Sequence, residues 1–142
     1  MDVVKLVEFF LERMLDWEVE YNKRRRSVGY KTSAEERFKA DIEARAKLAG
    51  VFEEFLSRKA NETIARSRLD MLNTARPPEF AQAVIVDSQK ESGDSFFVET
   101  FNAKALVPCR RYCVVVEDGV LKINALYGRA SEAEKWSSRE SI

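Results

Sequence analysis

The segment CRRYCVVVEDGVLKINALYGR, which runs from Cys109 to Arg129, constrains the fold of this chain more than any other. At its centre an Asp118-Gly119 pair is flanked by alternating β-branched residues. This pattern is one of the strongest short-range signals for a β-hairpin, because a tight primed turn needs positive φ at both central positions. The segment therefore predicts two long antiparallel strands. Their apolar side chains form a surface that the first half of the chain must cover.

The apolar residues from position 2 to about 25 predict one long amphipathic helix. They recur with a 4-3-4-3-4 spacing, which keeps them on one side of a helix with 3.6 residues per turn. These residues are Val3, Val7, Phe10, Met14, Trp17 and Tyr21, and Leu6, Leu11 and Leu15 widen the same face. A basic run at 23–26 falls at the C-terminal end of this helix, where positive charge complements the helix dipole.

A second helix is expected to begin at Ser33, which starts a Ser-x-x-Glu sequence of the capping-box form. It is expected to run to about Ala60. Its buried side is expected to hold Phe38, Ile42, Leu48, Ala49, Phe52, Phe55 and Leu56. A third, shorter helical stretch is expected over 62–72. The pair Pro77-Pro78 then ends any helix, because proline lacks the amide donor.

From Gln82 onward the pattern is typical of strands. The expected strands cover 83–86, 96–101, the residues after Pro108, and 120–127. Consecutive strands with short turns imply an antiparallel meander. We therefore expect an α+β fold in one domain over residues 1–142, with helices in 2–74 packed on a curved antiparallel sheet in 82–128. A polar tail follows over 130–142, with Trp136 as its expected anchor.

The bulk composition bounds the possible partners. A length of 142 residues suits one domain with one ordinary core. Lys plus Arg and Asp plus Glu number 24 each, so no net field attracts the protein to nucleic acid or to an anionic membrane. Charged residues interrupt the apolar pattern near the N-terminus, which argues against a signal peptide or a membrane span. We expect a cytoplasmic protein with neither nucleic acid nor membrane as a partner.

The residue inventory limits the possible chemistry. The two cysteines, Cys109 and Cys113, lie four apart in one expected strand, about 13 Å from each other, which is too far for a disulfide. The chain has no histidine, so it lacks a Cys/His zinc site and a Ser-His triad. It also lacks a glycine-rich phosphate loop. No metal, cofactor or catalytic set is therefore expected, although an Asp or Glu base stays open.

One face of the first helix has the composition of a binding surface. Glu8, Glu12, Asp16 and Glu20 recur every four residues opposite the apolar face, and Phe9 falls inside this acidic arc. A large aromatic residue surrounded by carboxylates is typical of a binding hot spot with a charged rim. Two other interpretations are open: a solvated face with one isolated aromatic, or Phe9 packed beneath the third helix or the tail.

Four further residues are candidates for a pocket. Asp41 and Arg45 fall in the centre of the second helix's apolar arc, at a spacing that lets them pair. A buried pair of this kind suits a pocket, whereas a rotated or kinked helix would place it at the margin. Glu99 lies between two phenylalanines and Arg111 between two cysteines. They either line a cavity between sheet and helices or lie on the solvated side of the sheet beside aromatics.

The order of these expected elements resembles the cone-shaped nuclear transport factor 2-like α+β fold. The terminal YCVVVEDGVLKINALYGR is similar to that superfamily's closing hairpin, in which a hydrophobic strand turns at Asp-Gly into a strand written W/L-K/R-I. RPPEF at Arg76 to Phe80, followed by a strand, resembles more specifically the bacterial immunity-protein branch. Members of that branch are encoded beside polymorphic toxins and neutralise them by binding. At the level of fold, the resemblance covers most of the chain.

The resemblance implies an immunity protein that occludes a cognate toxin domain, with the acidic helix face attracting a basic toxin surface. The superfamily also contains small isomerases and dehydratases, but none of their catalytic positions matches a residue of this chain. A second hypothesis is therefore a small-ligand or isomerase/dehydratase-like pocket protein that uses Asp41, Arg45, Glu99 or Arg111. A third is a homodimer through the exposed sheet face, which is compatible with either of the others.

Overall fold

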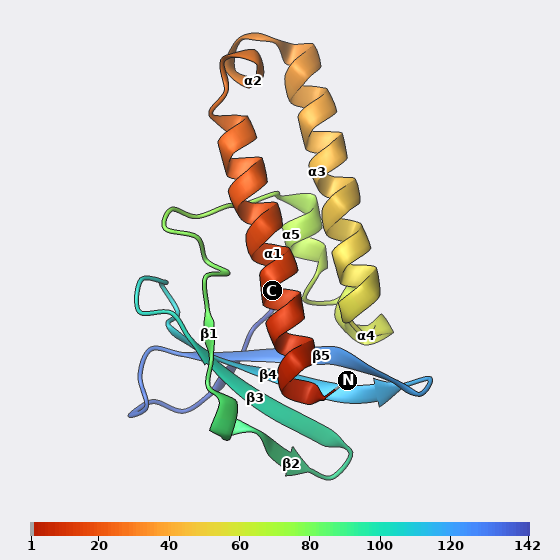
Figure 1. Ribbon diagram of the computed structural model, residues 1–142, viewed down its shortest axis with the longest axis vertical. Helices are drawn as coiled ribbons and strands as arrows, with labels where there is room; N and C mark the ends of the chain where they lie inside the picture. Colours follow the sequence, from red (N-terminus) through yellow and green to blue (C-terminus); the bar gives the residue numbers. More distant parts are fainter. Residues whose placement is uncertain (1) are drawn as a thin grey trace.

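Helices from the first half of the chain lie against one face of an antiparallel sheet from the second half in a computed structural model, which describes residues 2–142 (Figure 1). The helices are α1 (Val3–Arg25), α2 (Val28–Thr32), α3 (Ala34–Phe55), α4 (Arg58–Glu62) and α5 (Arg66–Asp70). The strands are β1 (Ala83–Val84), β2 (Lys90–Ser92), β3 (Ser95–Phe101), β4 (Cys109–Glu117), β5 (Val120–Arg129) and β6 (Ser137–Ser138), with a 3-10 turn, η1, at Val86–Ser88. The expected α+β class is confirmed. The sheet is not closed, which is consistent with a nuclear transport factor 2-like arrangement.

The first helix forms as its periodicity predicts. The side chain of Asp2 caps α1 by accepting a hydrogen bond from the backbone N–H of Lys5 at 2.7 Å. The six residues of the 4-3-4-3-4 pattern are all buried, and so are Leu6 and Leu11. None of the helices within residues 2–142 is long and apolar enough to cross a membrane. Burial of the wide apolar face holds α1 against the mild repulsion of its acidic side.

The second long helix differs from its prediction in rotation and length. The prediction is correct at the C-terminal end, where the buried residues are Leu48, Phe52, Phe55 and Leu56. Phe38 is 69% exposed and Ile42 is 47% exposed, and Ala49 is exposed as well. The other buried residues of this side are Ala40, Ala44 and Val51. The far end of the α1–α3 hairpin projects beyond the sheet (Figure 1), so only another helix can cover α3 there. Alanines allow that close approach, and the indole N–H of Trp17 donates to the carbonyl of Ala44 at 2.9 Å.

The end of α3 comes at Phe55 rather than at Ala60. Leu56 adopts an extended backbone and forms an isolated bridge with Ile123 of β5, whose carbonyl accepts a hydrogen bond from the N–H of Ser57 at 2.9 Å. The expected end of the second helix is a separate short helix, α4, and the helix expected over 62–72 is shorter, since α5 covers only Arg66–Asp70. Docking of the chain on the sheet therefore overrides local helix propensity.

The sheet has the strand order β1-β3-β4-β5-β6, and β2 pairs with β3 beside β1. Every pairing is antiparallel. The turn between β4 and β5 has positive φ at Asp118 (51°) and Gly119 (78°), which confirms the predicted hairpin. The first strand is shorter than expected because η1 interrupts it. β2 and β6 were not expected, since polar residues dominate both strands.

Alternation along the strands separates two faces of the sheet. Val98, Tyr112 and Leu126 point toward the helices and are buried. There the ring of Phe10 packs edge-to-face on Phe55 and Tyr112, with centroids 5.8 and 6.2 Å away. Burial raises the pKa of Tyr112 to about 12. The face that points away from the helices, called here the outer face, carries charged and aromatic side chains.

Candidate functional site

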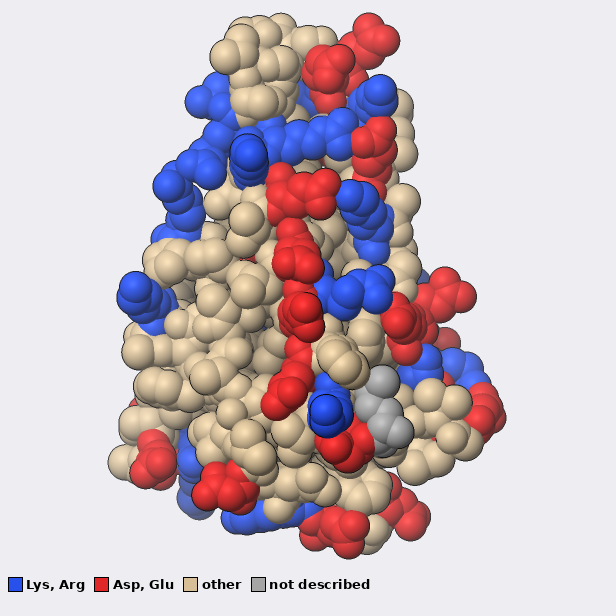
Figure 2. Space-filling model, in the orientation of Figure 1, with Lys and Arg blue, Asp and Glu red and all other residues tan. Residues whose placement is uncertain are grey.

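A row of carboxylates runs along the exposed side of α1. It consists of Glu8, Glu12, Asp16 and Glu20, all exposed, and is called here the acidic stripe. Figure 2 shows acidic side chains in a column along this part of the molecule. Four residues advance about 6 Å along a helix and rotate by slightly more than one turn, so the carboxylates follow one side of α1. The placement expected from the sequence is therefore what the structure shows.

Most of the acidic stripe is free of internal partners. Glu20 forms an ion pair with Lys47 of α3 at 2.9 Å. Within residues 2–142, Glu8, Glu12 and Asp16 form no ion pair or side-chain hydrogen bond. Carboxylates that stabilise nothing within the fold are free to bind an external cation.

Apolar side chains accompany the acidic stripe. Phe9 is 43% exposed and Val19 is 49% exposed, so both offer apolar surface to solvent. The polar tail, which was an alternative cover for Phe9, instead pairs with β5 through β6. A half-exposed aromatic ring beside unpaired carboxylates has the composition of a protein-binding anchor with a charged rim.

A groove adjoins the other side of the acidic stripe. It has a volume of about 280 Å³ and is lined by Glu8, Leu11, Glu12, Leu15, Phe80, Ala81, Gln82 and Val84. Two carboxylates of the stripe therefore stand at the rim of a mostly apolar groove. Long basic side chains have an apolar stem and a charged head, which is the combination that such a groove accommodates. The wall opposite α1 comes from the segment that follows the two prolines, with Phe80, Ala81, Gln82 and Val84.

A buried glutamate that the sequence analysis missed fixes this segment to α1. Glu18 is fully buried, and its two carboxylate oxygens accept hydrogen bonds from the backbone N–H groups of Ala75 and Phe80, both at 2.9 Å. Burying a carboxylate is costly unless it is hydrogen-bonded. Its position within the apolar arc of α1, between Met14 and Tyr21, was the available signal. Glu18 therefore positions the groove wall.

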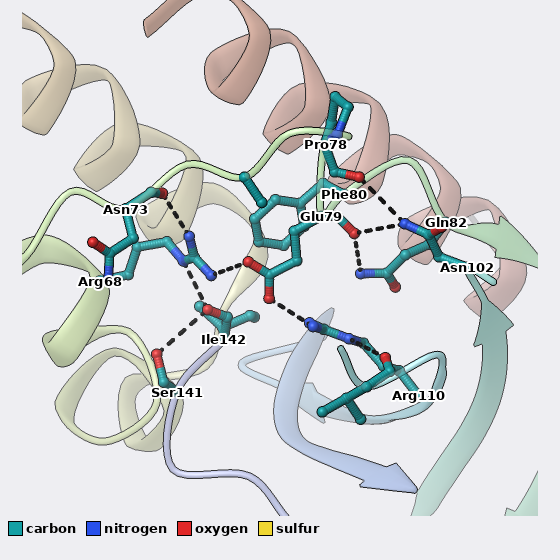
Figure 3. Close-up of polar contacts among 12 residues, drawn as sticks. Arg68, Asn73, Pro78, Glu79, Phe80, Gln82, Asn102, Arg110, Ser141 and Ile142 are labelled. Carbon is teal, nitrogen blue, oxygen red and sulfur yellow. Dashed lines mark hydrogen bonds and ion pairs between the residues drawn. The ribbon is translucent and has the colours of Figure 1, made fainter. Parts of the chain in front are cut away.

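A half-buried carboxylate, that of Glu79, belongs to the same segment (Figure 3). Glu79 accepts from Arg68 of α5 at 2.8 Å and from Arg110 of β4 at 2.6 Å. Arg68 also donates to the main-chain oxygens of Asn73 and Ile142, both at 2.8 Å. Burial alone would raise the pKa of Glu79, but the two guanidinium charges and their hydrogen bonds outweigh it and hold the pKa below its usual range. This cluster ties together α5, the sheet and the end of the tail.

The expected pair of Asp41 and Arg45 does not form, because each side chain has another partner. Asp41 is half-buried and accepts hydrogen bonds from the hydroxyls of Tyr21 at 2.7 Å and Tyr30 at 2.8 Å. Arg45 is exposed and donates to the carbonyl of Leu69 at 2.9 Å. Burial and the bond to Asp41 raise the pKa of Tyr21 well above its usual range. Rotation of α3, the alternative that the sequence left open, explains this placement.

Glu99 and Arg111 lie on the outer face, not between the sheet and the helices. The guanidinium of Arg111 lies 4.7 to 5.1 Å from the ring centroids of Phe97, Tyr127 and Trp136. Trp136 thereby anchors the tail, as expected. Glu99 stands 3.6 Å from Arg129. The space between helices and sheet holds the fully buried side chains Phe10, Met14, Phe52 and Tyr112.

Metal-binding residues and comparisons with known proteins do not assign a function to this chain. Residues 2–142 contain no group of three or more His, Cys, Asp or Glu side chains that could hold a metal ion. Both cysteines are free thiols. Comparisons of the chain with family models, with curated proteins and with solved structures give no match. The surface chemistry of the chain itself is therefore the basis for assigning a function.

Proposed function

We propose that this protein is a cytoplasmic immunity protein of the nuclear transport factor 2-like superfamily, which binds a cognate bacterial toxin domain and blocks it by occlusion. The observation that carries the proposal is the acidic stripe. Three of its four carboxylates, on Glu8, Glu12 and Asp16, have no ionic partner within residues 2–142. The exposed ring of Phe9 adds an apolar anchor beside them.

The two parts of this surface act on different steps of binding. Unpaired carboxylates attract a basic partner and raise the association rate, an effect that salt screens. The ring of Phe9 and the groove beside Leu15 bury apolar surface after contact, which slows dissociation. Toxin domains that act on nucleic acid need basic surfaces to hold phosphates. A row of carboxylates fits such a surface and prevents the substrate from reaching it.

The first test is a protection assay. The C-terminal domain encoded by a large neighbouring gene is expressed in a sensitive host, with and without this protein. We expect survival only when this protein is present, together with stable equimolar co-purification of the two proteins. Toxicity that this protein does not relieve contradicts the proposed function.

The second test locates the interface. The double variant Phe9→Ala with Glu12→Lys is expected to weaken toxin binding by more than about 2 kcal/mol in total. The matched control is Phe38→Ala with Glu35→Lys, which changes the same residue types at exposed positions of α3. We expect the control to bind as tightly as wild type. Unchanged affinity in the first variant rules out this face of α1.

A further inference from the structure

A cavity lies on the outer face of the sheet, away from α1. It has a volume of about 730 Å³, which is within the range of small-molecule sites. Its walls include Ile85, Phe101, Pro108 and Cys109, and its charged groups include Glu99 and Arg129. It is bounded by β1, the ends of β3, β4 and β5, and the first residues of the tail.

The register of the sheet builds this cavity. Phe101 of β3 pairs with Cys109 of β4, and Cys109 pairs with Arg129 of β5. Residues paired across neighbouring antiparallel strands have side chains on the same face. Phe101 and Ile85 are 44% and 40% exposed, so the cavity presents apolar surface that the fold leaves uncovered.

The guanidinium of Arg129 is poorly satisfied by the protein itself. Its Nη2 lies 3.6 Å from Glu99, longer than a hydrogen bond, and its Nη1 makes one long bond of 3.4 Å to the carbonyl of Glu134. Its buried Nε has no partner within residues 2–142. The group also stacks on Trp136, with its central carbon 4.0 Å from the ring centroid. A guanidinium held in place with unmet hydrogen bonds is suited to a planar anion such as a carboxylate.

The charged residues that line the cavity are Arg129, Glu99 and Glu132. Arg111 pairs with Glu99 in the strand register, but its guanidinium lies against the rings of Phe97, Tyr127 and Trp136, so Arg129 is the cation that a ligand in the cavity meets. Glu132 lies at the rim but is exposed, where solvent screens its charge.

We propose that this cavity binds a small ligand with an apolar body and a carboxylate head. The carboxylate contacts the guanidinium of Arg129, and the apolar body lies against Ile85, Phe101 and Pro108. The site is on the opposite side of the sheet from α1, so it is independent of the proposed toxin-binding surface. A negative result for one proposal therefore does not contradict the other.

The thiol of Cys109 makes the proposal directly measurable. Cys109 is half-buried and lines the cavity, whereas Cys113 is only 6% exposed. Alkylation at each cysteine is followed by mass spectrometry of the peptides, with octanoate, octanol or octylamine present at equal millimolar concentrations. We expect octanoate to slow alkylation of Cys109 by about tenfold at saturation, and the two other probes to protect far less, because only octanoate supplies the carboxylate. Tryptophan fluorescence should respond to octanoate as well, since Arg129 contacts Trp136.

The variant Arg129→Gln tests the role of the guanidinium. We expect it to weaken octanoate binding by about tenfold or more, because it removes a charge-assisted contact. The matched control, Arg13→Gln on α1, should bind octanoate as wild type does. Equal protection by octanol and octanoate, or no protection by octanoate, overturns the proposal. The probe comparison on wild type decides the question even if Arg129→Gln fails to fold.

Discussion

Glutamates of the same helix play opposite roles in this protein. Glu18 is buried, and both of its carboxylate oxygens accept backbone hydrogen bonds. Glu8 and Glu12, on the exposed side of α1, have no internal ionic partner within residues 2–142. Glu79 resembles Glu18 in that its carboxylate has partners within the fold, which are two arginines. The comparison separates carboxylates that stabilise the fold from carboxylates available to a partner.

The largest effect on stability is expected from Glu79→Ala. The variant leaves the buried guanidinium groups of Arg68 and Arg110 without a counter-ion, which typically costs about 3 to 5 kcal/mol. Urea unfolding of the variant beside Glu12→Ala measures the difference. Glu12→Ala should stay within about 0.5 kcal/mol of wild type. Equal stability of the two variants would contradict the distinction between carboxylates that stabilise the fold and carboxylates that do not.

Glu18→Ala is expected to have the next largest effect. The N–H groups of Ala75 and Phe80 lose their acceptors, at roughly 1 to 3 kcal/mol for each group that stays buried. Glu18→Gln keeps one acceptor oxygen and should lose less. Chemical denaturation of both variants measures which of them has the lower free energy of unfolding. If Glu18→Gln were the less stable of the two, loss of the backbone hydrogen bonds would not explain the destabilisation.

Acid should weaken the fold through Glu79. Its pKa is lower in the folded protein than in the unfolded chain, so its contribution to stability is complete above the unfolded pKa, about 4.3, and is lost as pH falls toward the folded value. Glu79→Gln should therefore show a flatter dependence of unfolding free energy on pH below that point. Parallel curves for wild type and variant would assign acid sensitivity to other groups.

Part of this arrangement was visible in the sequence. The hairpin at Asp118-Gly119 and the buried face of α1 were predictable, because turn chemistry and helical periodicity are local signals. The acidic stripe was predictable for the same reason. In contrast, β2 and β6 lack an apolar alternation, and so nothing local marks them as strands.

The partners of Glu18 and Glu79 could not be predicted. Glu79 binds Arg68 and Arg110, and Glu18 binds backbone groups some 60 positions along the chain. Such pairs depend on how the helices dock on the sheet. The rotation of α3 was hidden for a related reason: Phe38 looks like a core residue until the hairpin is seen to extend beyond the sheet.

The smallest effect is expected within the acidic stripe itself. Glu20 is already paired with Lys47, while Glu12 is not. Glu12→Gln should therefore reduce the association rate with a basic toxin more than Glu20→Gln does, with the difference shrinking as salt rises. Stopped-flow binding at several ionic strengths measures this. A larger effect at Glu20 would place the contact nearer the hairpin tip.

The projecting hairpin also sets how motion is distributed along the molecule. Near Phe52 and Phe55, α3 is held by both α1 and the core, whereas near Phe38 and Ile42 its side chains are exposed. Local opening needs the least free energy where the fewest apolar contacts break. Backbone amides should therefore exchange with solvent fastest near the tip and progressively more slowly toward the sheet. A partner bound to α1 would contact a rigid part of the helix at Glu8 and a more mobile part beyond Glu20.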